Sequence, residues 1–164
     1  MQRISRFASF VSVLQRRAGV WAVLSGSAAY PDIAGLVRFY QTPYGVLVAA
    51  EASGLPAGTE PCGGRIFGFH IHSGEQCAGD AADPFAAALG HYDPDGCPHP
   101  EHAGDLPPLF SNRGYSFQTL LTDRFSVREI VGRTVIIHAA PDDFTSQPAG
   151  NAGQKIACGR IVTR

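Results

Sequence analysis

Short stretches in which apolar and polar residues alternate, separated by turn-forming residues, fill most of the chain after residue 19. The alternation is clearest over residues 65–72, where Phe67, Phe69 and Ile71 share one face of a strand and the residues between them share the other. Further strands are predicted over residues 20–24, 36–40, 46–50, 115–121, 133–138 and 155–162. A Thr-Pro-Tyr-Gly turn at residues 42–45 predicts a hairpin. The pattern therefore predicts an all-β domain.

Two long segments lack this alternation and are rich in Gly, Pro and Asp. They run from residue 73 to about residue 112 and from residue 141 to 153. Long loops in a compact β domain usually carry function or are disordered, so we expect a functional site there.

The first 19 residues form a separate arm in this interpretation, followed by the β domain over residues 20–164. Helical spacing gives the arm one narrow apolar stripe made of Phe7, Phe10, Val11 and Leu14. A short amphipathic helix docked on the domain, or a frayed arm, is the favoured interpretation. The alternatives are a cleaved signal peptide, whose apolar stretch would be short, and a basic helix at a membrane surface.

Composition excludes several classes of protein. The chain has 164 residues, 45% of them hydrophobic and 16% charged, which suits one globular domain rather than a disordered chain. It is too short for a (β/α)₈ barrel of about 250 residues. A net charge of -1 gives no indication of nucleic-acid binding. No apolar run approaches the roughly 18 residues of a membrane span, so no stable membrane insertion is expected.

The candidate chemistry lies in the six histidines. His70 and His72 share one face of a predicted strand, where the Cα atoms of residues two positions apart are about 6.6 Å from each other. Their imidazoles can therefore reach one ion. His138 ends another apolar strand and can supply a third nitrogen. Imidazole ligands without thiolates suit copper or zinc. Surface or packed histidines would also explain this pattern.

A second group of possible ligands lies in the long segment after residue 73. His91, His99, His102 and Asp105 offer three imidazoles and one carboxylate, the donor set of a closed tetrahedral zinc site. A polar loop with incidental histidines is the alternative.

From about residue 20 to the end, the chain resembles the copper/zinc superoxide dismutases, with features of a bacterial branch that has shortened loops. The matching stretches are Gly68–His72, His91–Pro94, His102–Leu106, Gly132–His138 and Gly150–Gly159. Their order and content are specific to that family. The resemblance implies a Greek-key β-barrel or sandwich of about eight antiparallel strands with two long functional loops.

The resemblance also implies a role for each residue of the site. It implies copper ligands His70, His72, His91 and His138, and zinc ligands His91, His99, His102 and Asp105. His91 bridges the two metals and takes part in catalysis. Asp142 matches a carboxylate that links copper and zinc ligands through their outer ring nitrogens.

Lys155, the second implied catalytic residue, stands where the family usually has an arginine beside copper. It is the only lysine in the chain. An ammonium attracts an anion but lacks the planar donor geometry of a guanidinium, so reduced activity or a tolerated exchange is expected.

The residues alone leave the four cysteines open between thiols and disulfides. The resemblance implies a disulfide between Cys77 and Cys158, whereas Cys62 and Cys97 are extra and either pair or stay free.

The implied function is a superoxide dismutase that converts superoxide to O₂ and H₂O₂ with copper and zinc. The alternative is a non-catalytic copper/zinc-binding domain of the same fold, for storage or delivery. A metal-dependent hydrolase is disfavoured because barrel-type hydrolases are longer. A homodimer is left open. The cytoplasm is favoured over an extracytoplasmic location because no convincing export signal is seen, although the cysteines favour oxidising surroundings.

Overall fold

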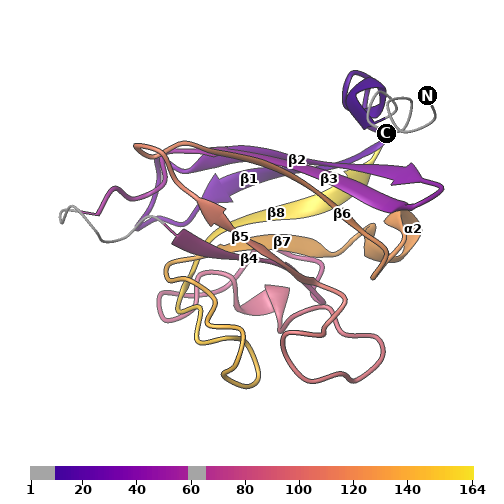
Figure 1. The fold of residues 1–164 in the computed structure, drawn as a ribbon. Helices are drawn as coiled ribbons and strands as arrows, with labels where there is room; N and C mark the ends of the chain where they lie inside the picture. The colour runs from indigo at the N-terminus through magenta and orange to yellow at the C-terminus, as the bar shows by residue number, and fades with distance from the viewer. Residues whose placement is uncertain (1–9, 59–65) are drawn as a thin grey trace.

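The computed structural model describes residues 10–58 and 66–164, which form one eight-stranded antiparallel sheet (Figure 1). The strands are β1 (Val20–Gly26), β2 (Ala34–Thr42), β3 (Gly45–Ser53), β4 (Ile66–His72), β5 (Asp105–Phe110), β6 (Ser116–Thr122), β7 (Thr134–His138) and β8 (Lys155–Thr163). Their order across the sheet is β5-β4-β7-β8-β1-β2-β3-β6. The sheet curls until its two edge strands approach each other, and Gln118 of β6 donates a hydrogen bond to the Pro107 carbonyl of β5 at 3.0 Å. The all-β barrel fold is confirmed.

Strand β4 separates the core from the candidate site. Phe67, Phe69 and Ile71 lie in the hydrophobic core inside the curled sheet. His70 and His72 point the opposite way and are still buried, at 0% and 2% exposed. The loops of residues 73–104 and 139–154 gather on that side, next to β4 and β7 (Figure 1). The alternation of β4 therefore directs its histidines under the two long loops.

The sequence analysis was wrong to leave residues 105–110 in a loop. They form β5, which contains Pro107 and Pro108 and pairs only with β4. Proline is tolerated on an edge strand, where a missing N–H breaks no ladder hydrogen bond. The register pairs His70 with Asp105, which brings a predicted zinc ligand next to a predicted copper ligand.

Two helical elements lie in the connections between strands. The 3₁₀ turn η1 (Ala86–Ala88) lies in the loop before β5, and α2 (Val127–Ile130) connects β6 to β7. A capping box between Ser126 and Glu129 starts α2. The hairpin predicted at residues 42–45 is present, because β2 and β3 pair from Thr42 and Gly45 outwards.

The described part of the N-terminal arm is helical over residues 10–14. Phe10, Val13 and Leu14 pack on the outer surface of the sheet, against a small apolar cluster in β2 and β3. The predicted apolar stripe was wrong at Val11, which is 59% exposed. The helix is so short that the spacing of its apolar residues does not determine which side packs on the sheet. Phe7 lies outside the described residues, and the domain boundary at residue 19 stays a prediction. No helix among the described residues is long and apolar enough to cross a membrane.

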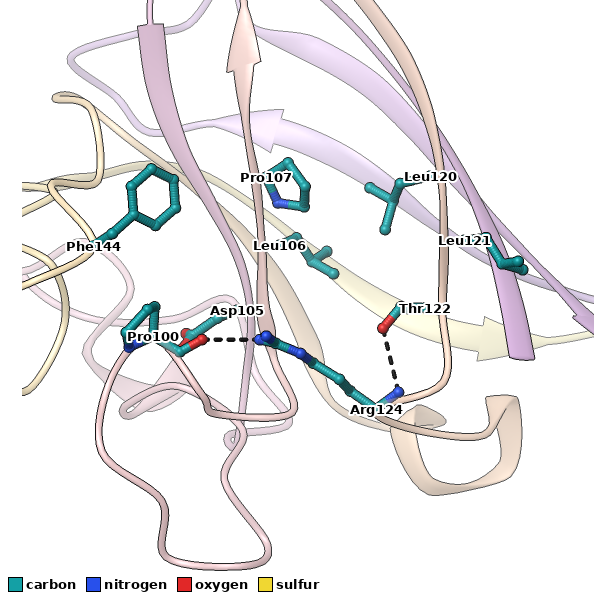
Figure 2. A pocket seen from close by; sticks show the side chains of 9 residues that line it. All are labelled: Pro100, Asp105, Leu106, Pro107, Leu120, Leu121, Thr122, Arg124 and Phe144. Carbon is teal, nitrogen blue, oxygen red and sulfur yellow. Dashed lines mark hydrogen bonds between the residues drawn. The ribbon is translucent and has the colours of Figure 1, made fainter. Parts of the chain in front are cut away.

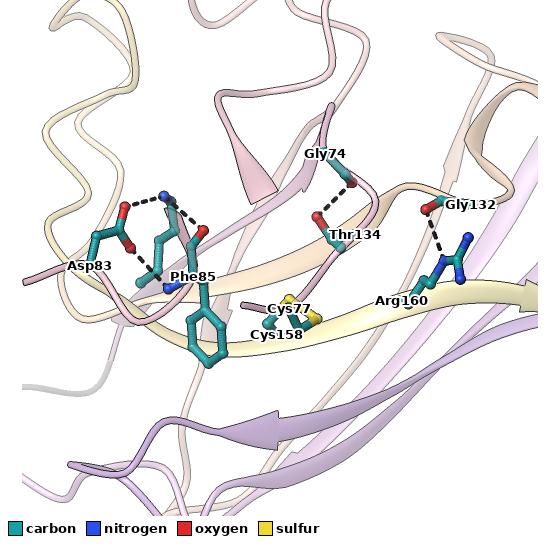
Figure 3. The surroundings of a disulfide bond; sticks show 9 residues. Gly74, Cys77, Asp83, Phe85, Gly132, Thr134, Cys158 and Arg160 are labelled. Carbon is teal, nitrogen blue, oxygen red and sulfur yellow. Dashed lines mark hydrogen bonds and ion pairs between the residues drawn. A yellow bond between two sulfur atoms is a disulfide. The ribbon is translucent and has the colours of Figure 1, made fainter. Parts of the chain in front are cut away.

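A disulfide ties the first long loop to β8. Cys77 and Cys158 are bonded, with Cα atoms 5.6 Å apart, and Cys158 is almost fully buried. Figure 3 shows this bond close to Asp83 and Phe85 of the same loop. Cys97 forms no disulfide with any described residue, and Cys62 lies outside the described residues.

Removing this disulfide is expected to lower the free energy of unfolding by up to roughly 4 kcal/mol, because it closes a long chain loop in the unfolded state. The bonded residues are 81 positions apart. Chemical denaturation of Cys77→Ser/Cys158→Ser measures the effect, with Cys97→Ser as the control for loss of a thiol. A double variant as stable as the control would contradict the prediction.

Candidate metal centre

Four buried histidines converge on the side of β4 and β7 that faces the loops. One nitrogen from each of His70, His72, His91 and His138 lies within 4.8 Å of the nitrogens of the others. Strands β4 and β7 are paired neighbours, and the loop histidine reaches the group through an isolated bridge between His72 and His91. The first predicted ligand set is therefore brought together.

Hydrogen bonds fix which ring nitrogens of this group carry a lone pair. His72 donates from Nδ1 to the Leu89 carbonyl at 2.8 Å, and His138 donates from Nδ1 to the Gly153 carbonyl at 3.0 Å. A carbonyl oxygen only accepts, so each Nε2 is an acceptor in the neutral ring. These two nitrogens lie only 3.2 Å apart. Two lone pairs aimed at one point fit a shared cation.

The third donor follows the same rule. His70 donates from Nε2 to Asp142 Oδ2 at 2.7 Å, which leaves its Nδ1 buried and without a hydrogen-bond partner among the described residues. Burial, reinforced by the neighbouring His70 imidazole, lowers the pKa of His138 to about 3. Burial likewise holds the pKa of His72 well below its usual value. These rings are therefore neutral at neutral pH, the form that binds a metal.

The second predicted ligand set is also assembled. Ligand atoms of His91, His99, His102 and Asp105 lie within 4.8 Å of one another. Asp105 Oδ2 is 3.0 Å from His99 Nδ1 and 3.2 Å from His102 Nδ1. Both of these Nδ1 atoms are buried, and neither has a hydrogen bond of acceptable geometry within the described part of the chain. A metal ion with tetrahedral coordination, bound by these nitrogens and the Asp105 carboxylate, would give both Nδ1 atoms a partner. The donor set therefore fits zinc.

His91 belongs to both groups. Its Nδ1 is 2.7 Å from Asp105 Oδ1, in the second group. Its Nε2 is buried on the side of the first group and has no hydrogen-bond partner among the described residues. The His70 and His91 ring centroids are 3.9 Å apart. One imidazole can thus join two metal ions.

Asp142 connects the two groups through one histidine of each. Its carboxylate accepts from His70 Nε2 at 2.7 Å and from His99 Nε2 at 2.9 Å. Burial alone would raise the pKa of Asp142, but hydrogen bonds from His70, the Phe144 amide and His99 outweigh it and hold the pKa well below the usual range. An ionised carboxylate here fixes both rings so that their other nitrogens face the metals.

The family model for copper/zinc superoxide dismutase matches residues 33–161. The chain belongs to the copper/zinc superoxide dismutase family. A copper/zinc superoxide dismutase of Aquifex aeolicus is 34% identical over 145 residues, which cover 79% of this chain and 80% of the relative. The enzyme of Photobacterium leiognathi is 35% identical over 141 residues, covering 77% and 78%. The enzyme of Deinococcus radiodurans is 35% identical over 146 residues, covering 77% and 76%.

Lys155 lines a cavity of about 520 Å³ that is also lined by His72, His91 and His138. Its ammonium donates to Asp83 Oδ2 at 2.6 Å and to the Phe85 carbonyl at 3.2 Å. The sequence analysis did not single out Asp83, because a loop rich in Ala, Gly and Asp gives no signal of which carboxylate turns towards β8. The predicted cation, Lys155, therefore lies at the wall of this cavity, where it forms an ion pair with Asp83.

Arg124, which was not predicted from the sequence, holds the backbone of the zinc loop, the segment of residues 97–104 that carries His99 and His102. Arg124 Nη1 donates to the Pro100 carbonyl at 2.9 Å and the His102 carbonyl at 3.3 Å. The residue borders a small pocket of about 300 Å³ between the zinc loop, β5 and β6, with Phe144 at its edge (Figure 2). Its guanidinium thus fixes the backbone on both sides of Glu101.

Arg124→Ala is expected to weaken zinc binding by roughly threefold to tenfold, since partly exposed hydrogen bonds contribute about 1 kcal/mol. Competition with a zinc chelator measures the change. Arg128→Ala, which removes an exposed arginine from α2, is the control. Equal zinc affinity in the two variants would contradict a role for Arg124.

Proposed function

We propose that the chain catalyses the disproportionation of superoxide: two superoxide anions and two protons give one O₂ and one H₂O₂. The observation that carries this proposal is the single imidazole of His91, shared by two groups of four ligands beneath an open cavity. A family relationship that spans most of the chain supports the same activity.

The residues that would hold the metals are the two groups described above. His70, His72, His91 and His138 would bind copper, and His91, His99, His102 and Asp105 would bind zinc. Bound copper would supply the one-electron chemistry that oxidises one superoxide and reduces the next. Imidazole nitrogens suit this ion, and a closed set of three imidazoles and one carboxylate suits structural zinc.

His91 is proposed as the proton carrier. Its Nε2 faces the copper group and can hold a proton, whereas its Nδ1 stays with the zinc group. His91 would keep its place when Nε2 is protonated, because its Nδ1 belongs to the group that would hold zinc. Forming H₂O₂ consumes two protons, one of which His91 can deliver and the other of which water in the cavity can supply.

Lys155 and Asp142 complete the proposed machinery. The ammonium of Lys155 attracts and orients the anion at the cavity wall. Asp142 does not touch the substrate, because it lies behind the histidines and acts by orienting them.

Metal analysis combined with superoxide turnover on one sample tests the proposal. After reconstitution we expect about one copper and one zinc per chain, and rapid catalysed decay of superoxide in stopped flow. The metal-free protein should be less stable, because the ligands converge only in the folded state. Zinc uptake without copper would contradict the catalytic function. Full loading without turnover would instead support the alternative, a storage or delivery domain.

A homodimer is a further proposal. Phe110 of β5 and Phe117 of β6 are 61% and 57% exposed, and burying them would favour association with a second copy. Sedimentation velocity tests this, and a monomer at every concentration would overturn it.

The cytoplasm is the proposed compartment. Cys158 is only 2% exposed, and burial shields its disulfide from cellular reductants. Fractionation of the source cells followed by immunoblotting tests the location, and recovery outside the cytoplasm would overturn it.

A further inference from the structure

We propose that Asp83 sets how strongly the site attracts its anionic substrate, because it holds the Lys155 ammonium and offsets its charge. This inference rests on the proposed function of the same site. It assigns a positioning and tuning role to a carboxylate that neither binds a metal nor touches the substrate.

The contact between the two side chains is short, and it joins a largely buried lysine to an Asp83 side chain that is 42% exposed. Asp83 Oδ2 accepts from Lys155 Nζ at 2.6 Å, and the Lys155 side chain is 14% exposed. The Phe85 carbonyl accepts a second hydrogen bond from the same ammonium at 3.2 Å. An ammonium has three N–H donors, so one remains for an anion in the cavity. Both residues line that cavity together with His91 and His138.

The loop places the Asp83 carboxylate independently of Lys155. Asp80 Oδ1 accepts from the amides of Ala82 and Asp83 at 2.8 and 3.0 Å, which forms a tight turn just before the carboxylate. Asp83 Oδ1 then accepts from the Phe85 amide at 3.1 Å and leaves Oδ2 for the ammonium. The backbone therefore fixes the direction of the carboxylate.

The loop is also attached to the sheet on both sides of this turn. Phe85 packs in a buried cluster with Ala88, Ile136 and Cys158. The disulfide at Cys77 holds the preceding segment, and Figure 3 shows it close to Asp83 and Phe85. The ion pair is thus built into a braced segment of the chain.

The charge of the pair follows from its surroundings. Burial alone would raise the pKa of Asp83, but hydrogen bonds from Lys155 and the Phe85 amide outweigh it and lower the pKa. Asp83 is therefore ionised at neutral pH. Asp83 consequently cancels much of the attraction that Lys155 alone would exert.

Asp83→Asn removes the charge and keeps the shape. The single amide oxygen can accept from either the Phe85 amide or Lys155, so one of these two hydrogen bonds is lost. The turn at Asp80 still holds the loop, and the Phe85 carbonyl still accepts from the ammonium. We expect azide, used as a probe anion, to bind the copper- and zinc-loaded variant roughly three- to tenfold more tightly at low ionic strength. The gain should shrink at high salt, because screening weakens the added attraction. Absorption titration with azide measures both affinities.

Asp80→Asn is the matched control. It makes the same change in net charge in the same loop, and its amide oxygen can still accept from the Ala82 and Asp83 amides that form the turn. Among the described residues Lys155 pairs with Asp83 and not with Asp80. Its azide affinity should stay within about twofold of the parent, as expected for a more distant exposed charge.

A second readout needs no metal. Lys155 is the only lysine, so its acetylation by an N-hydroxysuccinimide ester can be followed by peptide mass spectrometry in the metal-free protein. Asp83→Asn should speed this labelling, because it weakens the hydrogen bond that holds the ammonium, and Asp80→Asn should not.

The outcomes separate this inference from the proposed function. Azide affinity and labelling rate equal in Asp83→Asn and Asp80→Asn would overturn the inference, as would weaker azide binding by Asp83→Asn. A parent protein that fails to decompose superoxide would overturn the proposed function, whereas the azide and labelling experiments would still report on Asp83.

Discussion

Gly150→Ala is expected to weaken zinc binding by about 10- to 100-fold, the range typical of losing a group that orients a metal ligand. A Cβ atom on Gly150 would overlap the Asp142 carboxylate and lie 2.6 Å from His99 Nε2. The carboxylate would have to leave its position between His70 and His99. The orientation of both rings would then be lost, so the copper group should also become less ordered.

A matched glycine separates this displacement from backbone strain. Gly150 has a φ of +63°, which an alanine rarely adopts, and Gly153 has a φ of +76°. Among the described residues, a Cβ on Gly153 would meet only Ala140, its Cβ at 3.4 Å and its amide nitrogen at 3.7 Å, which are ordinary contacts. Gly153→Ala should therefore show the strain alone, with zinc affinity close to the parent. Chelator competition on both variants decides, and equal affinities would refute the steric role of Gly150.

The strands were predictable where one face of the strand is apolar. In β4, the alternation of Phe67, Phe69 and Ile71 gave both the strand and the side on which its histidines lie. It failed for β5, where Pro107 and Pro108 resemble a loop and only the edge position makes them acceptable in a strand. The side of the N-terminal helix that packs on the sheet could not be predicted from the sequence either. A helix of little more than one turn is too short for its apolar residues to define one face.

The two groups of candidate ligands were predictable because histidine is rare and its spacing is distinctive. The family resemblance grouped His91 with both ligand sets, and the structure brings both sets together. Residues that act through backbone contacts were not predictable. Arg124 and Asp83 owe their roles to a turn of the chain that places them against another loop or strand, and nothing in their local sequence distinguishes them from other surface charges.

Lys155→Ala is expected to slow superoxide turnover by tenfold or more at low ionic strength, through loss of local attraction for the anion. The structure adds a second cause. Without the ammonium, the Asp83 carboxylate remains at the cavity wall and repels the substrate, so repulsion replaces the attraction that the ion pair leaves in the parent. Metal content should not change, because Lys155 belongs to neither ligand group. Lys155→Arg should match or exceed the parent, since a guanidinium offers two parallel donors to a small anion.

Stopped-flow decay of superoxide at two salt concentrations, on fully metallated proteins, tests these expectations. Raising the salt concentration should slow Lys155→Arg, whose cation attracts the anion, and should speed Lys155→Ala, because screening then weakens the repulsion from Asp83. Adding Asp83→Asn to Lys155→Ala should recover part of the lost rate, because it removes the unpaired carboxylate. An alanine variant with the parent's rate and salt response would show that Lys155 does not guide the substrate. A double variant no faster than Lys155→Ala would show that the loss comes only from the missing cation.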